Sequence, residues 1–321
     1  MPSQTLDRLQ AAADVARPSH YGVLPLDDWI EAIVKDWLVP TLRPIFRALQ
    51  WPISQVLDGL QSLLLAIPFA VIVILAVLAA WRTAGRGIAL LTFLSLLLLD
   101  WIGVWQETMI TLAMIVTAVA FCIVVGIPIG IAAARSDRTA AIVRPILDVM
   151  QTIPSFVYLV PIVMLFGVGV VPAVIATIVF ALPPLVRLTN LGIRQVQEEL
   201  VEAGRAFGST PRQILWEIQL PLALRTIMTG VNQTLMLALS MAVIGALIGA
   251  GGLGLTVYTG LGRLDVGYAG IGGLGIVLMA IILDRITQAL GDGDGARRRK
   301  GAANPSAGGR KPEAAAAQEP A

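Results

Sequence analysis

The segment TMITLAMIVTAVAFCIVVGIPIGIAAA, residues 108–134, contains 27 consecutive residues without a charge. An α-helix rises about 1.5 Å per residue, so a run of this length can cross roughly 30 Å of hydrocarbon with some tilt. The whole chain has the same character, because 56% of its 321 residues are hydrophobic and only 14% are charged. Such a composition argues against a soluble globular protein and against disorder in most of the chain. We therefore predict an integral membrane protein.

Seven transmembrane helices are expected, which makes the fold class an all-α membrane protein. The uncharged stretch 149–186 would extend about 57 Å as one helix, so the glycines and proline at 167–172 are expected to divide it. The glycine-rich residues 249–262 are expected to form a re-entrant or external segment. The predicted spans are 62–80, 87–105, 108–134, 155–168, 172–187, 226–248 and 266–283.

Basic residues are concentrated on alternate connections between these spans. The connections 82–86, 135–148 and 187–225, together with the C-terminal side, carry 17 arginines and lysines, whereas the opposite connections carry only Arg263. Positively charged loops remain on the cytoplasmic side of a membrane. With seven spans, we expect the N-terminus outside and the C-terminus in the cytoplasm.

Three regions are expected along the chain. Residues 1–61 are expected to form an extracytoplasmic N-terminal segment with amphipathic helices, because apolar residues recur at helical spacing between 29 and 49. Those helices could lie on the membrane surface or on the protein itself. Residues 62–290 form the transmembrane domain, with a cytoplasmic connection at 187–225. The low-complexity residues 291–321 are expected to be a disordered cytoplasmic tail.

The chain is poor in residues that perform catalysis. It contains one histidine, His20, near the N-terminus, and one cysteine, Cys122, inside an apolar run. It also lacks the sequence G-x-x-x-x-G-K-[ST], whose backbone amides hold nucleotide phosphates. These absences argue against a membrane enzyme and against ATP hydrolysis on this chain.

The connection 187–225 has local signals for two short helices. Gly208 stands where a first helix would end with a residue of positive φ. Thr210, Pro211 and Gln213 have the spacing of a helix N-cap, a first-turn proline and a capping box. Pro221 is expected to end the second helix before the next span. Ala203 and Gly204 would leave a small-residue spot that lets another surface approach.

This connection resembles the EAA loop of permease subunits in bacterial ABC importers. The similarity consists of Glu202-Ala203-Gly204, then Gly208, and then Ile218-Gln219-Leu220-Pro221, and it departs from the family pattern where Gly204 replaces a second alanine. The resemblance implies a coupling helix that docks into a groove of a separate ATPase. The alternative is a loop that only packs under its own bundle. The implied coupling residues are Glu202, Ala203, Gly204, Gly208, Ile218, Leu220 and Pro221.

Residues 150–196, 230–255 and 263–288 resemble the glycine betaine/proline betaine/choline branch of these permeases. The resemblance implies a binding-protein-dependent ABC importer permease in the bacterial cytoplasmic (inner) membrane, working by alternating access. It would import glycine betaine, proline betaine, choline or carnitine. The implied partners are a second permease copy in a homodimer, two ATPase subunits and a periplasmic or lipid-anchored substrate-binding protein. ATP and Mg would bind the ATPase, with no cofactor on this chain, and nucleic acid is not an expected partner.

Polar residues within the spans are candidates for lining a translocation path. Gln233 and Ser240 are seven residues apart and therefore share one helix face with Met236, and Asn232 is adjacent. The alternative for each is an interhelical hydrogen bond. Tyr158 could offer its ring to a quaternary ammonium group or act as an interfacial anchor. The competing function is a stand-alone secondary transporter or channel for a small osmolyte.

Overall fold

The computed structural model describes Asp36 and residues 39–292, and every regular element in that part of the chain is a helix. The chain divides into two units, Met1–Arg47 and Ala48–Ala321. Helix α3 (Val39–Ala66) begins in the first unit, and the boundary expected after residue 61 falls inside it. Of the expected amphipathic helices between 29 and 49, residues 39–49 belong to α3, whereas residues 29–35, 37 and 38 lie outside the described residues, as does the expected tail beyond residue 292. The fold below is that of the second unit.

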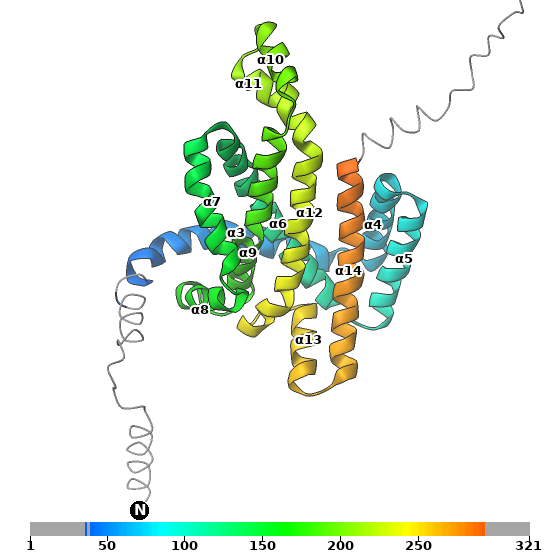
Figure 1. The fold of residues 1–321 in the computed structure, drawn as a ribbon. Helices are drawn as coiled ribbons and strands as arrows, with labels where there is room; N and C mark the ends of the chain where they lie inside the picture. Colours follow the sequence, from blue (N-terminus) through cyan, green and yellow to red (C-terminus); the bar gives the residue numbers. More distant parts are fainter. Residues whose placement is uncertain (1–35, 37–38, 293–321) are drawn as a thin grey trace, which may run out of the picture. The chain divides into compact units, whose positions relative to one another are not determined.

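Four helical stretches of the described chain are long and apolar enough to cross a membrane. Helix α9 packs against both α6 and α12, and α14 packs against α12 (Figure 1). Small residues allow these close contacts: a Cβ added at Gly130 of α6 would lie 2.5 Å from the Cβ of Thr189 on α9. The four stretches are α6 (Trp105–Arg135), α9 (Val170–Arg194), Pro211–Ile248 and α14 (Val266–Asp292).

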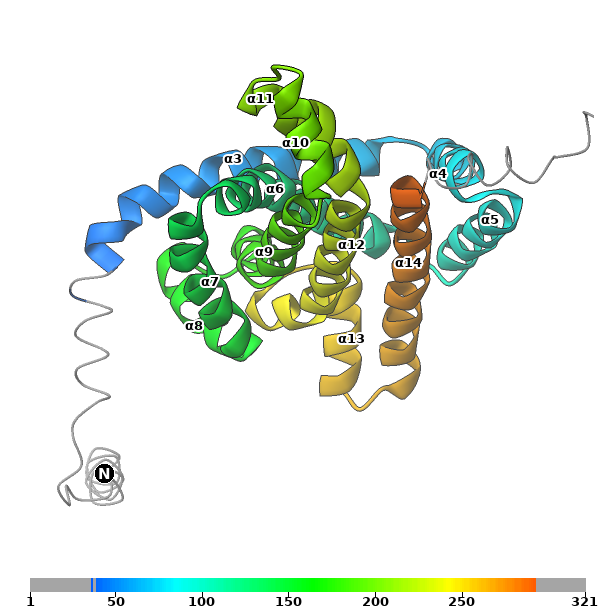
Figure 2. The same cartoon turned by 45° about the horizontal axis from the view of Figure 1, so that its top comes forward.

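The first predicted span, 62–80, is not one continuous helix, because Pro68 breaks that uncharged run. Residues up to Ala66 belong to α3, and α4 (Phe69–Ala84) leaves at an angle of 107°. A proline disfavours helical backbone at the residue before it, which hydropathy alone does not register. Gly85, with φ of 92°, then turns the chain into α5 (Arg86–Trp101), and this α4–α5 hairpin packs against α14 (Figure 2).

A second proline bend changes the interpretation of residues 137–168. Helix α7 (Asp137–Thr152) and helix α8 (Ser155–Phe166) meet at Pro154 with an angle of 101°. Helix α8 has 12 residues and is therefore about 18 Å long, too short to cross a bilayer alone. A separate span at 155–168 is not supported. Counting each bent pair as one span gives up to six in the described residues, so the predicted number of seven is not confirmed.

The expected turn near residues 167–172 is confirmed, since α8 ends at Phe166 and α9 begins at Val170. Helix α9 continues to Arg194, seven residues past the predicted end, because the arginines at its end can still reach water.

The prediction that Pro221 ends a helix is wrong. A π-helix (Ile214–Gln219) widens the backbone before this proline, which has no N–H to donate, and α12 (Leu220–Gly245) continues without a break.

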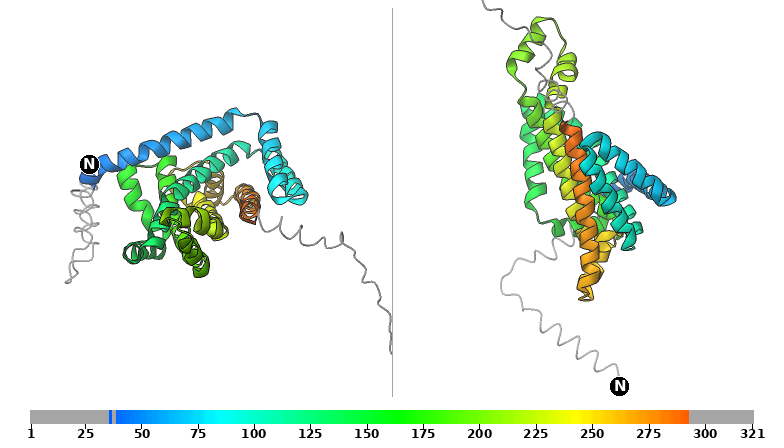
Figure 3. Two further views of the ribbon diagram at one scale, coloured as in Figure 1. Left: turned by 90° about the horizontal axis from the view of Figure 1, so that it is seen from above. Right: turned by 90° about the vertical axis from the view of Figure 1, so that its right-hand side faces the viewer.

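The predicted helix end near Ile248 is confirmed. A short 3-10 turn (Ala246–Ile248) follows α12, and Gly249 then adopts left-handed backbone with φ of 86°. The glycine-rich residues that follow form helix α13 (Leu253–Gly262), which returns into α14 as a hairpin. This hairpin lies at the end of α14 opposite to the segment between α9 and α12 (Figures 1 and 3).

Candidate functional site

The segment Glu198–Gln219, which we name the coupling segment, extends beyond the ends of the neighbouring helices (Figure 3). It begins with α10 (Glu198–Ala206) and turns at Gly208, whose φ is 81°. The backbone N–H of Gln213 donates to the Thr210 hydroxyl at 3.4 Å, and the Gln213 side chain accepts from the Thr210 N–H at 2.9 Å. The predicted glycine terminus and capping box are therefore both confirmed, and they define the turn between α10 and α11 (Pro211–Gln213).

The coupling segment has its own small core. Val201 of α10 and Ile214 of the π-helix are both buried. Gly204 is also buried, and a Cβ added there would lie 2.8 Å from Cδ1 of Ile218. The predicted close approach at Gly204 is confirmed, and the surface that approaches this glycine is the second helix of the same segment. The two helices consequently pack as one body.

The outward surface of this segment carries Glu202 and Ala203, which are both exposed. Two aromatic side chains are exposed beside them: Phe207 is 90% exposed and Trp216 is 66% exposed. Neither aromatic residue was among the predicted coupling residues, although an aromatic residue in a charged connection was a usable signal. Exposed aromatic side chains on a rigid turn are suited to anchor a partner protein.

The remaining coupling candidates connect the segment to α12. Ile218 and Leu220 are half-buried, whereas Pro221 is exposed at the second position of that helix. Because the helical backbone is continuous from Pro211 to Ile248, a displacement of the coupling segment would be transmitted directly along α12. The coupling function of these residues stays a prediction.

Asn232 makes the interhelical hydrogen bond that was the alternative to lining a path. Its side-chain amide donates to the carboxylate of Asp284 on α14 at 2.9 Å. Gln288 donates to the same carboxylate oxygen at 2.7 Å. These contacts join α12 to α14.

Gln233 and Ser240 are exposed on one face of α12, and Met236 between them is half-buried. The Ser240 hydroxyl donates to the carbonyl of Met236 at 3.1 Å, and Gln233 makes no hydrogen bond to any described residue. Polar side chains on a membrane helix usually face protein or a water-filled cavity rather than lipid. This face of α12 is therefore a candidate path or subunit contact.

Tyr158 does not lie on that face. Tyr158 as a whole is 9% exposed, and its hydroxyl donates to the carbonyl of Met150 across the bend between α7 and α8. The contact stabilises the bend and leaves little of the ring available to a ligand.

At the opposite end of the bundle, glycine residues bring three helix ends together. We name this region, around Gly167–Gly169 and Gly249–Gly252, the glycine-rich end. The N–H of Gly169 donates to the carbonyl of Ile248 at 2.7 Å, which joins α9 to α12. The N–H of Leu253 donates to the hydroxyl of Thr111 on α6 at 2.8 Å.

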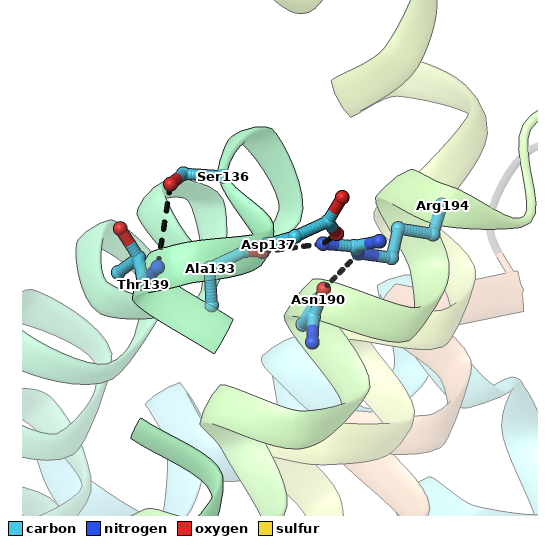
Figure 4. A network of polar contacts seen from close by, with 6 residues as sticks. All are labelled: Ala133, Ser136, Asp137, Thr139, Asn190 and Arg194. Atoms are coloured by element: carbon cyan, nitrogen blue, oxygen red, sulfur yellow. Dashed lines mark hydrogen bonds and ion pairs between the residues drawn. The ribbon is translucent and has the colours of Figure 1, made fainter. Parts of the chain in front are cut away.

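A third group of polar contacts lies where α6, α7 and α9 meet. Arg194 of α9 donates to Asp137 at 2.7 Å, to the carbonyl of Ala133 at 2.9 Å and to Asn190 at 2.9 Å (Figure 4). The Ser136 hydroxyl accepts the N–H of Thr139 and caps α7. These contacts hold the start of α7 against the end of α9. Among the described residues, no three His, Cys, Asp or Glu side chains are placed to hold a metal ion.

Comparison with known proteins gives consistent matches. Residues 126–293 match the family described as "Binding-protein-dependent transport system inner membrane component". The glycine betaine/proline betaine transport system permease protein ProW of Escherichia coli is 55% identical over 87% of this chain and 78% of its own length. The glycine betaine transport system permease protein OpuAB of Bacillus subtilis is 46% identical over 83% of this chain and 94% of its own length.

A solved structure, an inward-facing conformation of the methionine ABC transporter MetNI, contains a similar fold. The similarity has a TM-score of 0.51 and 26% sequence identity, and it covers 62% of this chain and 96% of that one.

Proposed function

The chain belongs to the family of binding-protein-dependent transport system inner membrane components, and from this membership we propose that it is the permease of an ATP-driven importer for glycine betaine or a related quaternary amine. The observation that carries this proposal is the 55% identity to the Escherichia coli glycine betaine/proline betaine permease over 87% of the chain. Relatives named for carnitine and choline support the wider substrate class, which includes proline betaine. The proposed location is the bacterial cytoplasmic membrane.

The coupling segment is the proposed contact with a separate ATPase. It extends beyond the bundle, its turn is fixed by Gly208 and Thr210, and it exposes Phe207 and Trp216 on one body. ATP would bind and be hydrolysed on the partner with Mg. Closure of two ATPase subunits would move two coupling segments together, and the continuous helix to Ile248 would pass that movement to the membrane region.

The translocation path is proposed to form between two copies of this chain. The exposed face of α12 carries Gln233 and Ser240, which would be costly to leave against lipid. A second copy would enclose this face, so that it lines a water-filled path in one of two alternating states. A substrate-binding protein would deliver the amine at the glycine-rich end, where the contacts of Gly169 and Leu253 hold the helix ends together.

Replacement of Gly208 by leucine tests the coupling assignment. Gly208 has positive φ and open space around it, so Gly208→Leu strains the turn without a steric clash. We expect the variant to insert in the membrane, while the complete complex in proteoliposomes hydrolyses ATP without matching uptake. Glu202→Lys, which reverses a charge on the exposed face of α10, is expected to give the same uncoupling.

Gly85→Leu is the matched control, because Gly85 also has positive φ and open space but lies in the α4–α5 turn. It is expected to retain coupled uptake. Normal uptake by both Gly208→Leu and Glu202→Lys would contradict the coupling assignment.

Cysteine labelling tests the proposed path. In a Cys122→Ala background, Gln233→Cys should react with a methanethiosulfonate reagent carrying a quaternary ammonium group, and glycine betaine should slow the reaction. Val277→Cys, at an exposed apolar position on α14, is the control and should stay unreactive in the membrane. Equal reactivity at both positions would show that the α12 face is no path.

Uptake competition between labelled glycine betaine and unlabelled choline, proline betaine or carnitine would define the substrate. The competing function, a stand-alone secondary transporter or channel, requires transport without the ATPase. The exposed coupling segment favours the importer.

A further inference from the structure

A pocket of about 350 Å³ lies between α7 and α9. Its lining includes Arg194, the last residue of α9, which is close in the chain to the start of the coupling segment at Glu198. Val143 and Leu147 of α7 and Val186 and Leu191 of α9 line its apolar walls. Arginine and aspartate side chains surround them. The pocket thus combines an apolar wall with a charged edge, which neither the coupling segment nor the proposed path explains.

The charges around this pocket do not balance. Arg187 pairs with Asp148 at 2.5 Å, and Arg194 pairs with Asp137 at 2.7 Å (Figure 4 shows the second pair). Arg144 also lines the pocket, and it makes no ion pair or hydrogen bond with any described residue. Both carboxylates are therefore already paired, and Arg144 leaves one positive charge uncompensated. An anionic ligand would complete the site.

The outer surface of α7 shows what surrounds this pocket. Ile142, Ile146 and Val149 follow one another at helical spacing and are between 54% and 66% exposed. Exposed arginines, Arg135 and Arg138, flank the start of the same helix. An apolar stripe bordered by arginines is typical of a helix at the membrane interface, where acyl chains meet charged headgroups.

We propose that the α7–α9 pocket binds one anionic phospholipid. Its headgroup phosphate pairs with Arg144, and the first methylenes of its acyl chains contact Val143, Leu147 and Leu191. Basic pockets between membrane helices are suited to acidic headgroups, because the cation and the apolar wall match the two parts of the lipid. A soluble phosphate ester could pair with Arg144 but would leave the apolar wall uncovered. The site depends on the membrane location of the chain and not on its transport activity.

Binding of phosphatidylglycerol to the full-length chain in mild detergent, followed by native mass spectrometry, tests this site. We expect one molecule to bind more tightly than phosphatidylcholine does. Arg144→Gln should weaken that binding about fivefold, which is the effect expected for one arginine near an anionic surface. Asp148→Asn should strengthen it, because Arg187 then loses its partner and gains a free charge. The Arg187–Asp148 pair is largely exposed, so its loss should cost little stability.

Arg138→Gln is the matched control, since it removes the same charge from α7 at an exposed position that does not line the pocket. It should leave the tightest binding unchanged. If Arg138→Gln and Arg144→Gln weaken lipid binding equally, the effect is one of general surface charge, and the proposed site is overturned. Unchanged binding in Arg144→Gln would also overturn it. If glycerol 3-phosphate displaces phosphatidylglycerol at the same concentration, the site binds a soluble phosphate ester, and the proposal of a bound lipid is overturned. If Arg144→Gln does not fold, the opposite change expected in Asp148→Asn decides the question.

Discussion

The two ends of the helical bundle are held together by different kinds of contact. The coupling segment is held by side chains: a capping box at Thr210, a buried Ile214, and Ile218 packed over Gly204. The glycine-rich end is held by backbone N–H groups, because Gly169 donates to the carbonyl of Ile248 and Leu253 donates to the hydroxyl of Thr111, for which Gly252 leaves room. A segment with its own core can bind a partner and move as one body. The glycine-rich end has no separate core, because its buried Ile248, Ala250 and Leu253 belong to the cores of the bundle itself. The difference supports the proposal that coupling takes place at the coupling segment.

The largest effect is expected from Gly252→Ala at the glycine-rich end. Gly252 has φ of 78° and ψ of −162°, a conformation that essentially only glycine adopts, and an added Cβ would lie 2.3 Å from the Thr111 hydroxyl oxygen. We expect a loss of about 3 kcal/mol or more in stability, seen as a lower melting temperature of the detergent-purified chain.

Gly270→Ala is the control for this change, because Gly270 lies in α14 and an added Cβ would have no atom within 4 Å apart from its chain neighbours and the backbone of its own helix. Its melting temperature should be unchanged or slightly higher. Equal destabilisation of both variants would mean that the close approach at Gly252 has no special importance.

The next effect concerns the coupling segment. Phe207→Ala removes the most exposed aromatic side chain of the proposed ATPase contact, and we expect the affinity for the ATPase to fall about 30-fold, as for an interface anchor. Pull-down titration with the purified ATPase measures this. Leu290→Ala, an exposed leucine near the end of α14, should bind the ATPase normally. An unchanged affinity in Phe207→Ala would remove this side chain from the contact.

A smaller effect is expected where α13 meets α6. Thr111→Val removes the hydroxyl that accepts the N–H of Leu253 while nearly preserving the side-chain volume. The loss should be about 1 kcal/mol, so hydrogen exchange around Leu253 should become roughly fivefold faster. Thr111→Ser keeps the hydroxyl and should exchange like the unchanged chain. The same exchange rate in the valine and serine variants would exclude this hydrogen bond as a stabilising contact.

Gly204→Ala should have the smallest effect of the series. The added Cβ would be in ordinary contact with Ile214 and would clash only with the flexible end of Ile218, which can turn away at a cost below about 1 kcal/mol. Uptake by the complete complex should therefore stay normal, whereas the larger Gly204→Leu should lower it by unpacking the segment. Loss of uptake in Gly204→Ala would place this glycine on the docking surface instead.

The sequence predicted those features whose signals are local. Gly208 and the Thr210–Gln213 capping box depend on residues within four positions, and both form as expected. The membrane class follows from composition. The helix breaks were harder to predict from the sequence. Pro68 and Pro154 lie in uncharged runs, and hydropathy alone assigns such runs to membrane spans without locating a bend.

Other features depend on contacts between distant residues. Pro221 was expected to stop a helix, and the π-helix before it allows α12 to continue. Gly204 is buried because Ile218 packs against it, and Tyr158 is buried because the chain bends at Pro154. Asn232 finds its partner on α14, 52 residues away. None of these pairings has a local sequence signal.

Uptake of labelled glycine betaine into liposomes tests the central claim most directly. Liposomes containing the full-length chain with its ATPase and substrate-binding protein should accumulate the amine only when ATP is supplied, and liposomes containing the chain alone should not. Accumulation at the same rate by the chain alone would contradict ATP-driven import and establish a stand-alone transporter.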